Sequence, residues 1–271
     1  MDSTGGIAIK KLLERLGVET VKLYCDPTGL FPHNPEPLKE NLSDLSKLVV
    51  NQAADLGIVV DPDVDRLAFV SEDGEVFGEE YTLVACADYY LKHNPGNTVS
   101  NLSSSRALKD VSDLNGCNHF FSAVGEVNVV ELMKKKNAVI GGEGNGGIIL
   151  PDLHYGRDAL VGIALFLSHL SNLNISCSQL RSKYPSYFMS KDKIMLDKTV
   201  NVDKIINEIS KKYSDQEINN EDGLKIDFEN SWVQLRKSNT EPIIRVYSEA
   251  KSQEEANMLS SKFIDEINMI K

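Results

Sequence analysis

The stretch GIVVDPDVDRLAFV, residues 57–70, places three aspartates at alternate positions between two apolar runs. Short apolar runs rich in β-branched residues predict buried strands. Pro62 lacks the backbone N–H that a sheet ladder requires, so Asp61, Asp63 and Asp65 are expected on a loop at the carboxyl end of the first strand. Three carboxylates held this close repel one another, which indicates that a cation belongs among them.

The chemistry of this loop favours magnesium. Hard oxygen ligands with open coordination positions suit Mg2+, which completes its octahedron with water and phosphate oxygens. Arg66 follows directly and supplies a fixed positive charge for a phosphate. Two alternatives stay open: a solvated acidic turn, and the start of a phosphatase of the haloacid dehalogenase type, whose first aspartate is the nucleophile. That phosphatase needs later lysine and paired-aspartate elements, and we find no convincing acidic pair in the right context.

The composition limits the class of protein. The chain has 271 residues, 41% of them hydrophobic, which is enough for the cores of two or three domains. It has no run of about 18 apolar residues and no basic region leading into an apolar one at the start, so we expect no membrane span, no signal peptide and a cytoplasmic location. The net charge of -11 disfavours nonspecific nucleic-acid binding, and four scattered cysteines argue against disulfides or a thiolate metal site.

Helical and strand patterns alternate through the first two thirds of the sequence. Helices are expected at residues 6–17 and 42–57 and strands at 21–25 and 58–60, with an irregular loop at 26–41, where four prolines occur. A similar alternation follows, with expected helices at 79–94, 105–114 and 125–136 and strands at 97–103, 118–123 and 137–142. Such alternation is typical of α/β domains with mostly parallel sheets, and the two stretches read as related units.

The last part of the chain changes character. Strands are expected at residues 192–197, 223–228, 231–237 and 242–250, with helices at 201–213 and 252–270. Strands flanked by helices indicate a small α+β domain. The predicted fold is therefore α/β, with two related α/β domains at residues 1–75 and 76–184 and an α+β domain at 185–271.

A glycine-rich segment, GGEGNGG at residues 141–147, directly follows a predicted strand. Glycines let the backbone approach a ligand closely, which leaves Glu143 and Asn145 as the side chains able to contact it. A carboxylate and an amide together match the hydroxyls of a sugar, although a plain turn is about as compatible with the pattern. No Lys and Ser/Thr follow the glycines, so this is not a P-loop.

A third segment, RKSNTEPIIR at residues 236–245, lies between two predicted strands. It concentrates hydrogen-bond donors on Arg236, Ser238, Asn239, Thr240 and Arg245. Arginine matches phosphate with two parallel hydrogen bonds, while hydroxyls and loop amides supply others. The segment predicts a phosphate site, with a polar hairpin as the alternative.

Taken in order, the motifs DPDVDR, GEGNGG and RKSNTEP resemble those of the α-D-phosphohexomutase superfamily, which includes phosphoglucomutase, phosphomannomutase and phosphoglucosamine mutase. The resemblance covers essentially the whole chain and implies the second, third and fourth of the family's four domains. It also implies that the first domain, which carries a phosphoserine in a T-A-S-H-N-P context, is missing here. Two departures stand out: Val64 replaces the usual glycine of the metal loop, which would strain a left-handed backbone, and Gly147 stands where many members have a histidine.

The resemblance further implies an Mg2+-dependent mutase that moves a phosphoryl group between C1 and C6 of a hexose phosphate through a hexose bisphosphate. By this comparison Asp61, Asp63 and Asp65 are metal ligands. The implied substrate-binding residues are Arg66, Glu143, Asn145, Arg236, Ser238, Asn239, Thr240 and Arg245. Without the phosphoserine, no catalytic nucleophile is expected, and the chain alone is expected to be inactive. A noncatalytic sugar-phosphate binding module, or a subunit completed by another chain, is the alternative, and neither the hexose nor the oligomeric state follows from the sequence.

Overall fold

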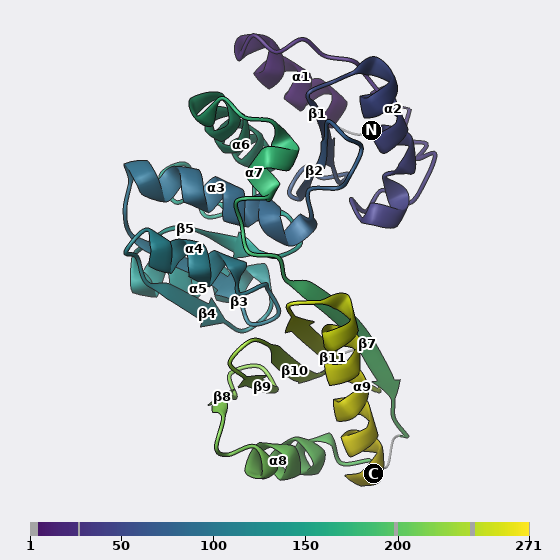
Figure 1. Cartoon of the computed structure of the whole chain (residues 1–271), viewed down its shortest axis with the longest axis vertical. Helices are drawn as coiled ribbons and strands as arrows, with labels where there is room; N and C mark the ends of the chain where they lie inside the picture. Colours follow the sequence, from purple (N-terminus) through teal and green to yellow (C-terminus); the bar gives the residue numbers. More distant parts are fainter. Residues whose placement is uncertain (1–4, 27, 198–199, 239–241, 271) are drawn as a thin grey trace. The chain divides into compact units, whose positions relative to one another are not determined.

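The computed structural model describes residues 5–26, 28–197, 200–238 and 242–270. The chain forms two compact units, Met1–Pro185 and Ser186–Lys271, most of whose elements are labelled in Figure 1. The helices of the first unit are α1 (Gly5–Arg15), the short 3-10 helix η1 (Lys39–Asn41), α2 (Ser43–Gln52), α3 (Glu79–His93), α4 (Ala107–Leu114), α5 (Glu126–Lys136), α6 (Ala159–Leu173) and α7 (Cys177–Arg181). Its strands are β1 (Leu56–Val60), β2 (Leu67–Ser71), β3 (Asn97–Asn101), β4 (His119–Ser122), β5 (Ala138–Glu143) and β6 (Gly147–Ile149). The division into three domains stays a prediction beside these two units.

Strands β1 and β2 form an antiparallel pair, with Val60 opposite Leu67, and the acidic loop joins them. The three aspartates therefore lie just beyond the carboxyl end of β1, as predicted from the missing backbone N–H of Pro62. The expected parallel sheet is wrong for this first segment, because the chain turns straight back through a short loop, whereas parallel strands need a crossover of about a dozen residues or more. The strand expected at 21–25 is also wrong, since these residues have no ladder partner and take irregular conformations.

The second sheet has the strand order β4-β3-β5-β6. Strand β3 is parallel to β4 and β5, with α4 and α5 as the crossover helices (Figure 1). Strand β6 returns antiparallel to β5. The parallel pairs confirm the predicted α/β class. Their carboxyl ends bring Asn101, Ser122 and Glu143 to one edge of the sheet, which is where open α/β sheets bind ligands.

Aromatic packing fixes the β1–β2 pair against the helical layer of the second sheet. Phe69 of β2 stacks on Phe166 of α6 with ring centroids 3.8 Å apart, and Phe77 meets Phe166 edge-on at 4.9 Å. All three rings are fully buried. Since aromatic pairs of this kind contribute about 0.5–1.5 kcal/mol beyond their burial, the acidic loop that precedes β2 is anchored to a rigid support.

A partly buried polar cluster holds α3 against α6. The carboxylate of Asp88 accepts from Lys92 Nζ at 2.9 Å and from the Tyr184 hydroxyl at 3.2 Å, and it lies 3.0 Å from His169 Nε2. Burial alone raises the pKa of Asp88, but the hydrogen bonds with His169 and Lys92 outweigh it and hold the pKa well below its ordinary value.

Replacing Asp88 by Asn is therefore expected to lower the free energy of unfolding at pH 7 by about 1–3 kcal/mol. A carboxyl with a lowered pKa in the folded state stabilises the fold fully above its unfolded pKa of about 3.9, and that contribution disappears as the pH falls toward the folded-state value. Urea unfolding of the original protein and of Asp88→Asn should show that their free energies of unfolding differ less at pH 3 than at pH 7. Equal stability at pH 7 would contradict the role of the cluster.

The second unit is an antiparallel sheet with helices on one face, as the α+β prediction required. Its strands, in the order β7-β11-β10-β9-β8, are β7 (Phe188–Met195), β11 (Ile243–Ala250), β10 (Trp232–Lys237), β9 (Leu224–Asp227) and β8 (Glu217–Asn219). Its helices are α8 (Val202–Lys212) and α9 (Gln253–Ile270). Val233, Leu235, Ile244 and Val246 face the helices in one apolar core, so the alternate residues of β10 and β11 face the other way.

Two further expectations concern the whole chain. The four cysteines are free thiols, with Cys86 and Cys177 buried and Cys25 and Cys117 half-buried, in agreement with the absence of a disulfide framework. Among the described residues no helix combines the length and the apolar character needed to cross a membrane.

Candidate functional site

The acidic loop is built around the buried carboxylate of Asp61. One oxygen, Oδ1, accepts from the backbone N–H groups of Asp65 at 3.1 Å and Arg66 at 3.0 Å, and Oδ2 accepts from Arg66 Nε at 2.7 Å. Asp61 is fully buried, so these bonds replace the water it has lost. This carboxylate therefore sets the shape of the loop in addition to facing its interior.

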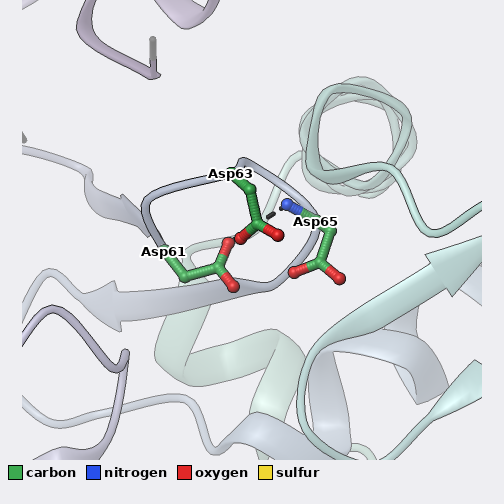
Figure 2. A group of neighbouring side chains, drawn as sticks. All are labelled: Asp61, Asp63 and Asp65. Atoms are coloured by element: carbon green, nitrogen blue, oxygen red, sulfur yellow. Dashed lines mark hydrogen bonds between the residues drawn. The ribbon is translucent and has the colours of Figure 1, made fainter. Parts of the chain in front are cut away.

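The three aspartates converge as the sequence predicted. Each of Asp61, Asp63 and Asp65 offers one carboxylate oxygen, and these oxygens lie within 4.8 Å of one another. Figure 2 shows the three carboxyl groups gathered at the loop, with the hydrogen bond from the Asp65 backbone to Asp61. The Oδ1 atom of Asp65 is buried and has no hydrogen-bond partner. Arg66 Nε lies 3.6 Å from this atom, too far for a hydrogen bond. A buried carboxylate oxygen without a hydrogen bond is costly, so this atom fits a metal ligand.

Burial and hydrogen bonding shift the pKa values of Asp65 and Asp61 in opposite directions. Burial, together with the neighbouring Asp61 carboxyl, raises the pKa of Asp65 to about 7. For Asp61, burial also acts to raise the pKa, but the bonds with Asp65 and Arg66 lower it overall. Such splitting is expected when two like charges share a site without a cation between them. A bound divalent cation would favour both ionised forms.

Val64 adopts the left-handed backbone that the sequence identified as a difficulty. Its φ is +65°, a rare conformation for a β-branched residue. Two backbone bonds hold it there: Val64 N donates to Asp61 O at 3.3 Å, and Val64 O accepts from Ala159 N at 3.2 Å. The loop thus keeps its turn without glycine and accepts local strain, a feature that clusters at functional sites.

The glycine-rich segment lies against the acidic loop. Arg66 and Gly147 form an antiparallel bridge, and Leu67 N donates to Gly146 O at 3.1 Å. Gly146 has a φ of +86°, and a Cβ there would stand 2.2 Å from Leu67 O, so only glycine permits this approach. The structure therefore brings together two of the three predicted loops.

Glu143 is buried at the centre of this junction. Its Oε1 accepts from Asn101 Nδ2 at 2.8 Å and from Gly125 N at 3.2 Å, and its Oε2 accepts from Arg157 NH1 at 2.8 Å. Asn145 is half-buried, and its side-chain oxygen accepts from Gly147 N at 3.3 Å. Glu143 and Asn145 thus sit at the carboxyl end of β5, close to the acidic loop.

Arg66 has acidic partners on two sides. Besides its bond to Asp61, its guanidinium donates to both carboxylate oxygens of Glu36, with NH2 to Oε1 at 2.9 Å. Burial alone lowers the pKa of Arg66, but the bonds to Glu36 and Asp61 raise it overall, so the charge is permanent. A phosphate contact by Arg66 would require the pair with Glu36 to open.

The phosphate segment belongs to the second unit. Arg236 of β10 stands directly opposite Arg245 of β11, and Arg245 stands opposite Lys193 of β7. Like charges placed opposite one another on a sheet destabilise it, so this basic row fits an anion held between its members. Among the described residues, Arg236 pairs with Asp222, with Nε 3.1 Å from Asp222 Oδ2. Ser238 is buried, and its backbone N–H donates to Ile243 O at 3.1 Å.

Asn239 and Thr240, the other two residues predicted for the phosphate segment, lie outside the described residues. Sequence reasoning also missed four side chains at these sites: Asn101, Ser104, Arg157 and Lys193. Ser104 Oγ donates to Asn101 Oδ1 at 2.9 Å and accepts from Gly144 N at 3.0 Å, so it ties the glycine-rich segment to the loop after β3. Asn101 could have been found, because it lies near the carboxyl end of the strand predicted at 97–103. Arg157 and Lys193 carry no local sequence signal.

Fold and site together define an α/β protein in which an acidic loop that could hold a cation lies against a glycine-rich loop at the carboxyl end of β5. Family models match nearly the whole chain: phosphoglucomutase/phosphomannomutase α/β/α domain II at residues 1–74, α/β/α domain III at 78–187 and the C-terminal domain at 194–266. The chain belongs to the phosphoglucomutase/phosphomannomutase family.

Individual relatives agree with this family. The chain is 36% identical over 94% of its length to a phosphoglucomutase/phosphomannomutase of Thermococcus kodakarensis and 32% identical, again over 94%, to a probable phosphoglucosamine mutase of Methanopyrus kandleri. A solved structure of a phosphoglucomutase/phosphomannomutase family protein from Burkholderia thailandensis matches 99% of the chain with a TM-score of 0.87 and 26% identity. The chain spans 56%, 57% and 58% of the lengths of these three proteins. None of these matches supports the haloacid dehalogenase alternative.

Proposed function

We propose that this chain forms the metal-, sugar- and phosphate-binding part of an Mg2+-dependent phosphohexomutase, which moves a phosphoryl group between C1 and C6 of a hexose phosphate through a hexose bisphosphate. The observation that carries the proposal is the acidic triad, whose oxygens lie within 4.8 Å of one another, together with a buried oxygen of Asp65 that accepts no hydrogen bond. Membership of the family and the adjacent glycine-rich loop support it. Glucosamine, mannose and glucose phosphates are all candidate substrates, since the relatives carry more than one of these names.

In this proposal Asp61, Asp63 and Asp65 hold the cation. The residues fit it, because oxygen donors and a partly solvated loop are what Mg2+ requires. When bound, Mg2+ neutralises charge on the transferred phosphoryl group. Asp61 has a second task here, since its bonds to the backbone of Asp65 and Arg66 preserve the loop in which the ligands stand.

Substrate binding is assigned to both units. Glu143 accepts hydrogen bonds from sugar hydroxyls, Asn145 donates and accepts, and Arg66 contacts phosphate once its pair with Glu36 opens. The phosphate that does not react is held in the second unit by Arg236, Ser238, Asn239, Thr240 and Arg245, and Lys193 extends this basic row. Two arginines side by side match the oxygens of one phosphate group.

The phosphoserine that carries the phosphoryl group in this family is not assigned to any of the 271 residues. Since positioning and electrostatics cannot replace the missing carrier, we propose that these residues alone do not turn over substrate. A noncatalytic binding module, or a subunit completed by another chain, uses the same contacts and is the second candidate. We place either form in the cytoplasm, where hexose phosphates are metabolised.

A pair of measurements on the isolated chain tests this proposal. Calorimetry with glucosamine, mannose and glucose 6-phosphates, with and without Mg2+, should detect binding that Mg2+ strengthens. A mutase assay with each substrate and its 1,6-bisphosphate should detect no turnover. Absence of binding to all three sugars would refute sugar-phosphate recognition, and robust turnover would refute the assignment of the nucleophile to residues beyond these 271.

A further inference from the structure

Arg157 lies where the acidic loop meets the glycine-rich loop. It precedes α6 and contacts three carboxylates from three different segments. Its NH2 pairs with Asp65 Oδ2, its NH1 donates to Glu143 Oε2 at 2.8 Å, and its Nε lies 3.4 Å from Glu126 Oε2. One guanidinium therefore connects a proposed metal ligand to a proposed sugar ligand.

The backbone beneath this side chain is fixed. Arg157 N donates to Glu126 Oε1 at 3.1 Å, and the next residue, Asp158, caps α6 by accepting from Leu160 N at 2.7 Å and Val161 N at 3.2 Å. Asp158 N also donates to Ile148 O at 2.8 Å, which joins the segment to β6. The Arg157 side chain itself is mostly shielded from solvent, with 19% of its surface exposed. It therefore reaches the junction from a rigid support, as a positioning group requires.

The two carboxylate oxygens of Asp65 have different surroundings. Arg157 occupies Oδ2, whereas Oδ1 is buried, accepts no hydrogen bond and lies 3.6 Å from Arg66 Nε. The pairing thus fixes the carboxylate so that one oxygen remains for the cation. The guanidinium can bind Asp65 and Glu143 at once because its N–H donors lie in one plane and point in different directions. A lysine ammonium is instead a point charge on a flexible stem.

Room for Arg157 depends on a glycine. A Cβ on Gly147 would stand 2.4 Å from Arg157 Cδ and 3.1 Å from its Cγ. These are atoms of the side-chain stem, so even an alanine would push the guanidinium away from its two carboxylates. Gly147 does not have a positive φ, so the substitution carries no left-handed backbone strain. Gly147 therefore offers a second, independent way to displace Arg157.

We infer that Arg157 is a positioning residue that couples the two loops: it orients Asp65 for the metal and Glu143 for the sugar, and the affinity for Mg2+ depends on it. The inference rests on the proposed function, in which Asp65 is a ligand. Outer partners of metal ligands typically contribute about 10–100-fold to metal affinity. Loss of a nearby positive charge would by itself strengthen cation binding. A weaker metal affinity after its removal consequently reports orientation and not charge.

The test is Mg2+ titration by calorimetry, with Mn2+ electron spin resonance as a second readout of the free ion. Arg157→Gln should weaken binding about tenfold or more. Arg157→Lys keeps the charge but should also weaken it, because one ammonium cannot hold both carboxylates. Gly147→Ala should weaken binding as well, and the double variant Gly147→Ala/Arg157→Gln should be no weaker than Arg157→Gln, since both act through the same side chain. Arg15→Gln, an exposed arginine in the last turn of α1, is the matched control.

The outcomes separate the inference from the function beneath it. If Asp63→Asn abolishes Mg2+ binding while Arg157→Gln binds as well as the original protein or better, the inference is overturned and the metal site stands. Full affinity in Arg157→Lys, or additive losses in the double variant, would also overturn it. If Asp63→Asn binds Mg2+ unchanged, the metal site itself is wrong. Thermal unfolding of each variant, with a midpoint near that of the original protein, shows that the fold is retained; Gly147→Ala supplies the result if Arg157→Gln fails to fold.

Discussion

Replacing Asp63 by Asn is expected to weaken Mg2+ binding by at least about 100-fold, because residues that only support metal ligands already contribute about 10–100-fold. Asp63 is the exposed member of the triad, and its carboxylate oxygen lies within 4.8 Å of those of Asp61 and Asp65. An exposed side chain can lose its charge with little effect on folding. The variant should therefore unfold at nearly the same temperature as the original protein, while calorimetry detects little or no Mg2+ binding.

Asp63 is the aspartate whose replacement best separates metal binding from folding stability. Asp61→Asn would confound binding with stability, because this fully buried carboxylate accepts three hydrogen bonds from the loop. Asp55→Asn is the matched control, since Asp55 is exposed, lies just before β1 and leaves the triad untouched. Equal Mg2+ affinity in Asp63→Asn and Asp55→Asn would show that the loop is only a solvated acidic turn.

The sequence predicted the acidic loop because its signal is local. Two apolar runs, a proline that cannot pair and three alternate aspartates lie within fourteen residues, so the loop and the convergence of Asp61, Asp63 and Asp65 followed from chain geometry. The strand prediction at residues 21–25 was wrong because it, too, used only local sequence. An apolar run shows that a strand is possible, but a strand exists only where a neighbour supplies the ladder, and that depends on distant residues.

Long-range partners of the site could not be predicted for the same reason. Glu36 pairs with Arg66, and Arg157 pairs with Asp65 and Glu143, although these partners stand far apart in the sequence. An isolated arginine or glutamate resembles any surface charge until the fold places it. Val64 could be predicted only in part. The sequence indicated strain in a left-handed backbone at this position, but the hydrogen bonds of its backbone N–H and C=O groups, which hold the turn, appear only in the structure.

Replacing an arginine of the basic row in the second unit is expected to cause a large loss of phosphate affinity. Arg236→Gln and Arg245→Gln should each lower the affinity for hexose 6-phosphates by about 100-fold or more, because an arginine–phosphate contact supplies two charge-assisted hydrogen bonds of about 1.5–3 kcal/mol each and 1.4 kcal/mol corresponds to tenfold. Calorimetry at constant ionic strength measures this loss. Lys237→Gln is the matched control, since Lys237 is exposed and its side chain points to the opposite face from Arg236.

Stability gives an independent check on the same pair. Arg245 stands between two cations, Arg236 and Lys193, so its removal relieves repulsion when no phosphate is bound. Arg245→Gln should thus lose phosphate binding and yet unfold, without ligand, at the same temperature as the original protein or slightly higher. Arg236→Gln should not gain in this way, because it also loses the ion pair with Asp222 at 3.1 Å. If Arg245→Gln instead destabilises the unit and binds hexose phosphate normally, the basic row serves the fold and the phosphate site lies elsewhere.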